Sequence, residues 1–583
     1  MNHKRLAGAA VVALVGLGLF GAVTPATAEP SDTAQITING ETIPNHTYVA
    51  YLLATYDNVQ TDAGSVTGFD LVTDPAVKAA ITQVVAARDS AYDATQQAAV
   101  DPLQWVSTFW QSDSSGRAVA WTDATSAGDT VRALANDLAQ QIESGALQVP
   151  SSVQAAASND KVTLDVTEGL WLVLETTGSH TSATTNSLPV IMGTPFMDGA
   201  TALNGGPSGQ IDIKGDVVSI DKDIVNAIDA QPEGFDGAAN MATGSEVEDV
   251  WTATTGDSVG FVIRTNVPFY PDSYVDPVFQ INDSWTAGLS APTGVVVKAD
   301  GATLVLGADY TYTAEANNGT FTITLVNPAA QGGKDILVEY SSTVTAAGTT
   351  VTRDTNGASV EFTNNWWLVN GGTDGKGGPT TDETTTDTVD VYTFPLNVIK
   401  ADLTARGTYL AATFTVKDAD GKQVGTITTD GTSAGGFVTG SDGKAASLAG
   451  NAWYQVEESV VPVGYTPLNT TVAKFWVYIS AGLTEGQAAD AVAPVYRYAD
   501  SSSADISQGN AALSTYVDPV VATGDDANDA DVLVLNAKTS SDMPQTGGQI
   551  LLWVTVAGVL GLGAAGFAVA GVRKSRTRSA HTA

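Results

Sequence analysis

Two lysines in this sequence interrupt apolar strand faces, which is where an amine can be made reactive. Side chains two residues apart in a β-strand point to the same face of the sheet. By this count Lys222 and Lys400 each point where the core residues of their own strand point. An unpaired buried ammonium is costly, so each lysine needs partners. The shared faces are Val218, Ile220, Lys222 and Ile224 in one strand, and Phe394, Leu396, Val398 and Lys400 in the other.

The same count supplies each lysine with one carboxyl group and one carboxamide. Asp283 and Glu458 each end an alternating apolar face, and so do Asn364 and Asn536. Both sets run in the order lysine, acid, asparagine along the chain. Asn356 shares the face of Asn364, so two asparagines are candidate partners for Lys222.

Three such groups in a dry interior can react. Burial lowers the pKa of an amine and raises that of a carboxyl group, so the lysine becomes nucleophilic and the acid stays protonated. A protonated acid can polarise the asparagine carbonyl and pass protons to the departing ammonia. The expected product is a Lys–Asn isopeptide bond, with Asp283 and Glu458 as the catalytic acids. The alternative is a buried salt bridge between lysine and acid, with the asparagine nearby by coincidence.

The C-terminus carries a second chemical signal in three parts. The word MPQTG at 543–547 precedes an uncharged apolar run at 550–572, and a basic tail follows at 573–583. At 1.5 Å per residue the run is long enough to cross a bilayer core of about 30 Å. The basic tail indicates that the extreme C-terminus is cytoplasmic. A buried core helix is the alternative for the apolar run.

The N-terminus has the pattern of a signal peptide over residues 1–28. Lys4 and Arg5 precede an apolar stretch, and the small residues at 26–28 form a cleavage signal. The region between the two ends is therefore expected outside the cell, where its lack of cysteine means that no disulfide stabilises it.

Composition excludes several functions. The formal net charge of −37 argues against binding to nucleic acid or to anionic lipid. Four histidines and no cysteine give no basis for a transition-metal site, and we expect neither metal nor cofactor. The sequence shows no nucleophile–base–acid set of the Ser/His/Asp kind, so it does not favour an enzyme.

Residue periodicity predicts a mainly β protein with tandem Ig-like or Cna-type β-sandwiches behind an α+β N-terminal domain. Helical spacing over 75–100 and 128–147, with strand patterns around it, predicts the N-terminal domain at 35–205. Short alternating strands then predict one sandwich at 215–370 and a second at 389–540. The polar stretch 371–388 is expected to be a linker.

The second sandwich resembles the CnaB-type domain of Gram-positive surface proteins. The resemblance rests on VIKADLTARGTYLAATFTVKDADGK, YQVEESVVPVGY and VLVLNAK; Ala411 stands where glycine is usual. SIDKDI, INDSWTAGL and GASVEFTNN resemble the middle domain of fimbrial shaft subunits. Together with the two ends, the sequence is similar to a sortase-assembled major pilin. This resemblance implies isopeptide crosslinks at Lys222, Asn364, Lys400 and Asn536.

MPQTG is similar to the sortase signal LPxTG, with Pro544, Thr546 and Gly547 matching and Met543 in place of leucine. The resemblance implies that a sortase cuts after Thr546 and transfers its carboxyl group to an amine. In a pilus the acceptor is a lysine of the next identical subunit, and the place that matches the family's pilin motif makes Lys214 the candidate. The usual tyrosine and proline are absent from that motif.

The resemblance leaves two functions open for an anchored surface protein. One is a shaft subunit with sortase, identical subunits and peptidoglycan as partners, located in the fimbrium or cell wall. The other is a monomeric wall-anchored adhesin that binds a host surface protein or glycan.

Overall fold

The structure is a computed structural model, and it describes only part of the chain in detail. The described residues are 33–40, 46–88, 92, 100–109, 127–150, 152–156, 160–176, 183–213, 215–225, 247–271, 274, 276–315, 318–369, 378–466, 474–503, 517–519 and 531–538. The expected signal peptide, sorting motif, apolar run and basic tail lie outside these ranges. Among the described helices none is long and apolar enough to cross a membrane.

The described chain is mainly β, as its alternating patterns predict, and it divides into two compact units. One unit holds the described residues up to Trp251, together with Ser258–Thr343 and Asp354–Asp390. The other holds Thr252–Asp257, Val344–Arg353 and the described residues from Val391 onward. The first unit therefore contains both the N-terminal α+β part and the middle sandwich.

The N-terminal part has two sheets with an apolar core between them. Buried residues of both sheets, including Ile36, Tyr48, Leu164 and Trp171, form one cluster. The smaller sheet has the order β10-β1-β5, and the larger has β3-β2-β6-β7 with β4 paired to β2. Their bounds are β1 Thr33–Asn39, β2 Thr47–Asp62, β3 Ser65–Thr73, β4 Ser152–Ala156, β5 Lys161–Thr167, β6 Leu170–Thr176, β7 Val190–Gly193 and β10 Gln210–Asp212, and a small hairpin joins β8 Met197–Asp198 to β9 Thr201–Ala202.

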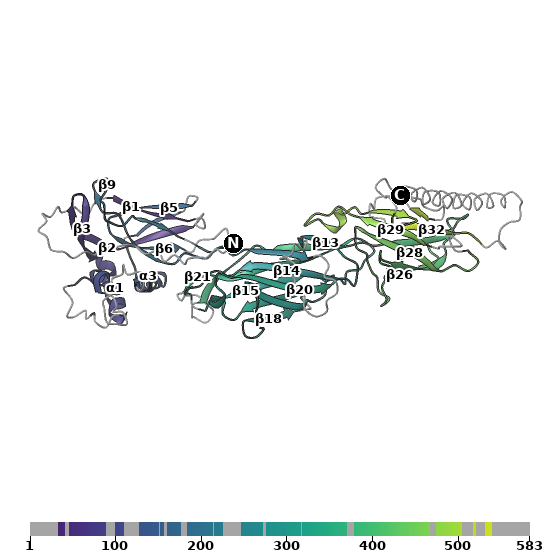
Figure 1. The fold of residues 1–583 in the computed structure, drawn as a ribbon, viewed down its shortest axis with the longest axis horizontal. Helices are drawn as coiled ribbons and strands as arrows, with labels where there is room; N and C mark the ends of the chain where they lie inside the picture. Colours follow the sequence, from purple (N-terminus) through teal and green to yellow (C-terminus); the bar gives the residue numbers. More distant parts are fainter. Residues whose placement is uncertain are drawn as a thin grey trace, which may run out of the picture. The chain divides into compact units, whose positions relative to one another are not determined.

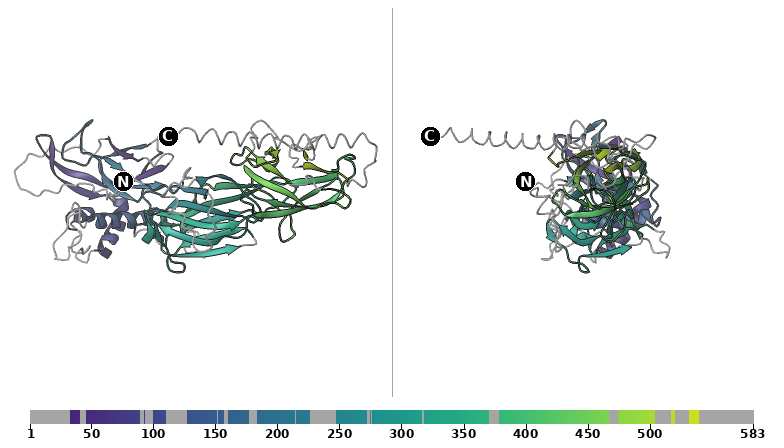
Figure 2. Two further views of the ribbon diagram at one scale, coloured as in Figure 1. Left: turned by 45° about the vertical axis from the view of Figure 1, so that its right-hand side comes forward. Right: turned by 90° about the vertical axis from the view of Figure 1, so that its right-hand side faces the viewer.

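In the described part of the N-terminal region, three helices contact the larger sheet or one another: α1 Pro75–Arg88, α2 Pro102–Phe109 and α3 Ala127–Glu143. In Figure 1, α1 and α3 lie together on one side of β2 and β6, and the left view of Figure 2 shows the same grouping. Helices α1 and α2 both begin at an Asp-Pro pair. The side chains of Asp74 and Asp101 accept hydrogen bonds from the backbone N–H groups of Ala76 and Leu103, which caps each first turn. The sequence patterns predict α1 and α3, but they miss the short α2. The helical prediction over 75–100 is also too long, because α1 ends at Arg88 and Tyr92 is not helical.

The middle sandwich is made of two facing sheets. One has the order β12-β11-β14-β20-β16-β17 and the other β13-β23-β21-β15-β19-β18, with β22 paired to β21. The first consists of β11 Ile220–Val225, β12 Val247–Glu248, β14 Ser258–Asn266, β16 Thr293–Ala299, β17 Ala302–Thr303 and β20 Asp335–Thr343. The second consists of β13 Val250–Thr252, β15 Phe279–Trp285, β18 Tyr310–Glu315, β19 Thr320–Leu325, β21 Thr352–Val369, β22 Gly378–Glu383 and β23 Asp387–Thr393.

Part of the expected linker belongs to this sandwich. Residues 378–383 form β22, which pairs with β21 through contacts such as Glu361 opposite Glu383. The stretch lacks large apolar residues, but an edge strand needs only backbone partners on one side. The linker prediction for 371–388 is therefore too long at its C-terminal end. Its first residues, 371–377, lie outside the described part.

The described residues of the C-terminal unit form one continuous sheet of nine strands, in the order β30-β29-β28-β25-β26-β27-β24-β32-β31. The short strand β27 pairs with β26 on one side and with β24 on the other, which joins the two layers. The first strand, β24, runs parallel to the last long strand, β32, with Lys400 opposite Val534. The bounds are β24 Asn397–Asp402, β25 Ala411–Lys417, β26 Gln423–Asp430, β27 Gly436–Thr439, β28 Ala452–Val460, β29 Lys474–Ser480, β30 Val495–Ala499, β31 Val517–Pro519 and β32 Asp531–Asn536.

Candidate functional site

In the C-terminal unit, the structure brings together Lys400, Glu458 and Asn536, the three residues that the strand count selects. They come from β24, β28 and β32. The Lys400 Nζ atom lies 2.6 Å from Asn536 Oδ1 and 3.1 Å from Glu458 Oε1. Asn536 Nδ2 in turn donates to Glu458 Oε1 at 2.9 Å. Each of the three groups therefore contacts the other two.

This cluster is shielded from solvent. The side chains of Lys400 and Glu458 are both 0% exposed, and the Lys400 amine lies 5.6 Å from the centre of the Phe414 ring. Burial lowers the pKa of Lys400 to about 8, although the Glu458 carboxylate opposes the shift. A substantial fraction of this amine is thus neutral at a mildly alkaline pH, which is the form that attacks a carbonyl.

Asp402 fixes the turn that follows Lys400. Its carboxylate accepts hydrogen bonds from the backbone N–H groups of Thr404 and Ala405, at 2.7 and 2.9 Å, and from the Tyr465 hydroxyl at 2.9 Å. Burial opposes ionisation, but these hydrogen bonds outweigh it and lower the pKa of Asp402 to about 2. The carboxylate holds the end of β24, and so helps to fix the direction from which Lys400 enters the core.

The middle sandwich holds a second buried cluster around Lys222. The Lys222 amine forms an ion pair with Asp283 Oδ2, and both side chains are completely buried. Lys222 comes from β11 and Asp283 from β15, so the pair joins the two sheets. Burial lowers the pKa of Lys222 and raises that of Asp283, so both shifts favour the neutral forms.

A tyrosine that the sequence does not single out completes this cluster. The Tyr340 hydroxyl lies 2.8 Å from Lys222 Nζ and donates to Asp283 Oδ2 at 2.8 Å. It also accepts a hydrogen bond of 2.7 Å from Asn356 Nδ2. Tyr340 alternates with Ile336 and Val338 on the inward face of β20, where an aromatic residue is ordinary core. Only the three-dimensional arrangement shows its polar contacts.

Of the two candidate asparagines, the structure places Asn356 in the Lys222 cluster and not Asn364. On β21, Ala358 lies opposite Asp283 and Phe362 opposite Phe279. Asn356 is therefore a diagonal neighbour of Asp283, whereas Asn364 lies six residues past Ala358, about 20 Å along the strand. Asn364 is only partly buried, and its backbone oxygen accepts a hydrogen bond from Asn186. The expected Lys222–Asn364 pair does not fit this register, because Asn364 is too far along the strand.

The residues expected to join one subunit to the next lie outside the described part of the chain. These are Lys214, Pro544, Thr546 and Gly547. Their predicted roles stay predictions.

The chain is similar to solved structures of bacterial pilins. With the T6 backbone pilin of serotype M6 Streptococcus pyogenes it shares 15% identity at a TM-score of 0.48, covering 88% of this chain and 100% of that one. With the major pilin SpaD of Corynebacterium diphtheriae it shares 14% identity at a TM-score of 0.44, covering 88% of this chain and 99% of that one. With BcpA, the major pilin subunit of Bacillus cereus, it shares 13% identity at a TM-score of 0.37, covering 87% of this chain and 100% of that one. No protein-family model and no curated protein sequence matches the chain.

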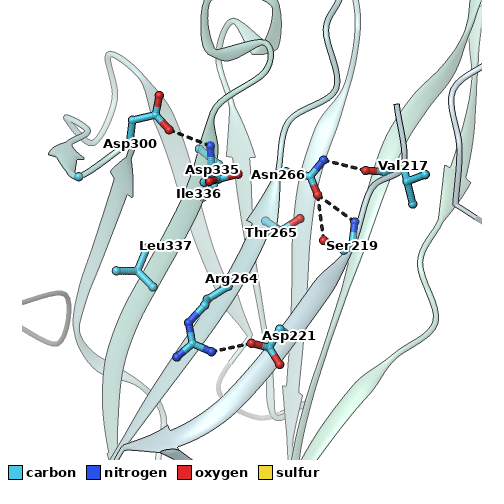
Figure 3. Close-up of a pocket in the computed structure, with 11 residues that line it drawn as sticks. Val217, Ser219, Asp221, Arg264, Thr265, Asn266, Asp300, Asp335, Ile336 and Leu337 are labelled. Atoms are coloured by element: carbon cyan, nitrogen blue, oxygen red, sulfur yellow. Dashed lines mark hydrogen bonds and ion pairs between the residues drawn. The ribbon is translucent and has the colours of Figure 1, made fainter. Parts of the chain in front are cut away.

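A pocket of about 780 Å³ opens on the outer face of the β11-β14-β20 sheet (Figure 3). Several of its polar side chains are paired: Asn266 Oδ1 accepts from the Ser219 hydroxyl, and Arg264 donates to Asp221. Ser219 thus donates to an amide and not to a base. The pocket offers no nucleophile–base pair, and we assign it no reaction.

Proposed function

We propose that this chain is a structural subunit of a covalent cell-surface pilus, hardened by two internal Lys–Asn isopeptide bonds. The observation that carries the proposal is the dry contact of Lys400, Glu458 and Asn536, in which an amine of lowered pKa lies against a carboxamide and an acid. The proposed bonds join Lys400 to Asn536 and Lys222 to Asn356.

The chemistry of each bond follows from the groups present. The neutral lysine amine attacks Cγ of the asparagine, the acid polarises the carbonyl, and the amide nitrogen leaves as ammonia. In the C-terminal cluster, a half-turn of the Asn536 carboxamide presents Oδ1 to Glu458. The product is neutral, so bond formation removes the cost of a buried ammonium and carboxylate.

Sortase assembly is the second part of the proposal and rests on the sequence. Cleavage after Thr546 and transfer to Lys214 of the next copy would link subunits head to tail, and transfer to peptidoglycan would anchor the last one. The strongly acidic chain suits an exported protein that carries no disulfide. The bonds inside each subunit then do what disulfides do elsewhere.

Intact mass tests the internal bonds. We expect the folded full chain to weigh less than its sequence by two molecules of ammonia. Peptide maps should recover Lys400 joined to Asn536 and Lys222 joined to Asn356. An unshifted mass, with both lysines recovered as free side chains, would refute the crosslinking proposal.

Polymer formation needs a separate test in cells that carry the cognate sortase. Detergent gels of wall extracts should show a ladder of covalent multimers that is abolished by Lys214→Ala. Lys161→Ala is the matched control, because Lys161 is an exposed lysine on β5. A single wall-linked species in the wild type would instead favour the monomeric adhesin.

A further inference from the structure

The Tyr340 hydroxyl lies at the centre of the middle cluster. It contacts the attacking amine of Lys222, the carboxyl group of Asp283 and the amide nitrogen of Asn356, all at 2.7–2.8 Å. In the C-terminal cluster the amine, acid and amide touch one another directly. In the middle cluster the Tyr340 hydroxyl thus bridges the amide of Asn356 and the acid of Asp283, whereas in the C-terminal cluster the amide and the acid contact each other directly.

We propose that Tyr340 is a catalytic residue of the middle crosslinking reaction, which relays protons between Lys222, Asp283 and the departing nitrogen of Asn356. This inference rests on the proposed isopeptide function and assigns a residue to it. The reaction in the C-terminal cluster needs no such relay, because Glu458 reaches Asn536 itself.

The relay balances without any further reactant. The Lys222 nitrogen forms a bond to Asn356 Cγ, and the bond from Cγ to Nδ2 breaks. The attacking amine gives up one proton, and the leaving nitrogen gains one to depart as ammonia. Tyr340 gives its hydroxyl proton to Nδ2, and Asp283 Oδ2 takes a proton from the amine and passes it to the Tyr340 oxygen, so the hydroxyl and the acid both end as they began.

Packing holds the Tyr340 ring in place independently of its hydroxyl group. The ring stacks on Phe261 with centres 5.3 Å apart, and the Phe321 ring meets it edge-on at 5.2 Å. Tyr340 is completely buried. Removing the hydroxyl should therefore leave the ring, and with it the core, nearly unchanged.

Two buried oxygens that lack a hydrogen-bond donor also support the proton relay. Among the described residues, Asp283 Oδ1 and Asn356 Oδ1 are both buried without a hydrogen-bond donor. Asp283 and Asn356 occupy diagonal positions on one face of paired strands. A protonated Asp283 can donate from Oδ1 to the asparagine carbonyl while its Oδ2 stays bonded to Tyr340. This arrangement polarises the carbonyl and keeps the relay intact.

The test follows bond formation in the full chain after cell-free synthesis, with crosslinked and free peptides quantified over time. We expect Tyr340→Phe to slow the Lys222–Asn356 bond by about a hundredfold or more, the usual size of a proton-transfer contribution. The Lys400–Asn536 bond in the same molecules should form at the wild-type rate. Tyr312→Phe is the matched control, because Tyr312 also packs on Phe321 but makes none of the three contacts.

A second variant separates proton transfer from packing. Fluorinated tyrosines at position 340 keep the hydroxyl and nearly the same shape but change its acidity, so a relay predicts rates that vary with that acidity. Equal rates across this series, or wild-type bond formation in Tyr340→Phe, would overturn the assignment of Tyr340. Absence of both bonds in the wild type would instead count against the proposed function.

Discussion

At the scale of single residues, the two clusters bring together the same three kinds of chemical group with different geometry. Each places an amine, an acid and a carboxamide in a buried site, where an unpaired charge is costly. The C-terminal site uses a glutamate long enough to touch the amide, and the middle site uses a shorter aspartate with Tyr340 between. The side-chain length of the acid therefore goes together with the presence of the tyrosine.

Glu458→Gln should leave Lys400 unreacted, because the glutamine cannot supply a proton. The mass of the folded chain should then show the loss of one ammonia and not two. Lys400 and Asn536 are 136 residues apart, so the lost loop closure should cost about 5 kcal/mol of unfolding free energy. Glu457→Gln is the control, since Glu457 pairs with Lys417 on the exposed side of the same strand. Bond formation in Glu458→Gln would contradict the role given to the acid.

The two asparagines of β21 can be distinguished by substitution. Asn356→Ala should abolish the middle crosslink and lower the melting temperature, because Asn356 carries the carbon that Lys222 attacks in the proposed reaction. Asn364→Ala should leave the crosslink intact, since Asn364 lies eight residues, about 26 Å, further along the strand than Asn356. Peptide mapping of Lys222 in both variants decides the matter. The reverse result would restore the sequence-based pairing.

The C-terminal reaction should speed up with pH. With a Lys400 pKa of about 8, the neutral fraction of the amine rises about fiftyfold between pH 6 and pH 8 and at most about twofold above that. Because the folded pKa lies below the usual 10.5, the unreacted ammonium destabilises the fold at pH 7, and this cost declines between pH 8 and pH 10.5. Timed mapping of the Lys400 peptide at each pH checks this, and a flat profile would contradict it.

At the scale of strands and turns, β24 and β32 are the pair on which the C-terminal unit depends. They run parallel, so the chain enters at Asn397 and leaves at Asn536, at opposite ends of the pair. Tension between these ends shears all the intervening hydrogen bonds together. The proposed Lys400–Asn536 bond lies within this pair and takes the load before those hydrogen bonds do.

The turn after β24 should depend on the charge of Asp402. Asp402→Asn should lower the unfolding free energy by about 2 kcal/mol at pH 7, because the carboxylate accepts several hydrogen bonds that an amide accepts less well. The folded pKa of about 2 lies below the usual 3.8, so this contribution is present above pH 4 and is lost as the pH falls through 2. Denaturant unfolding at pH 7 and at pH 2 should therefore show the difference shrinking. A difference in unfolding free energy that is the same at pH 7 and at pH 2 would contradict this role of the Asp402 carboxylate.

The sequence predicts the inward faces of these strands well, because a period of two leaves only two choices for each. Lys222, Asp283, Lys400, Glu458 and Asn536 are all buried as the alternation predicts. The count cannot choose between Asn356 and Asn364, which share a face, since that choice depends on the register of β15 against β21. It cannot single out Tyr340 either, because an inward tyrosine looks like ordinary core until its partners from other strands are known.

Local patterns also miss elements that depend on distant partners. The eight residues of α2 are too few for a clear helical period, and an aspartate and proline at its start are its main signal. Strand β22 is polar and forms because β21 extends far enough to pair with it. Both elements need their surroundings, so the sequence alone does not predict them.

At the scale of the whole molecule, the proposed bonds define a short covalent route for tension. It runs from Lys214 to Lys222, across to Asn356, along the chain to Lys400, across to Asn536 and on to Thr546. In this scheme most residues of the middle sandwich and of the C-terminal unit lie off the route. Stiffness under load then depends on two bonds and three peptide segments, the longest of which runs from Asn356 to Lys400.

Single-molecule pulling measures this directly. The wild-type chain should show no unfolding step from the C-terminal unit below the force that breaks covalent bonds. Glu458→Gln should release the 136-residue segment between Lys400 and Asn536, an added length of about 450 Å. Glu457→Gln should behave like the wild type. An extension of that length in the wild type would mean that the bond is absent.

The parallel pairing of β24 with β32 has a consequence for survival among proteases. An enzyme that cuts one loop between these two strands severs the backbone of the subunit, yet the proposed Lys400–Asn536 bond would still join the two fragments. A filament built of such crosslinked subunits would stay in one piece after a cut in one of these loops. Cleavage of a surface loop would then not by itself break the filament.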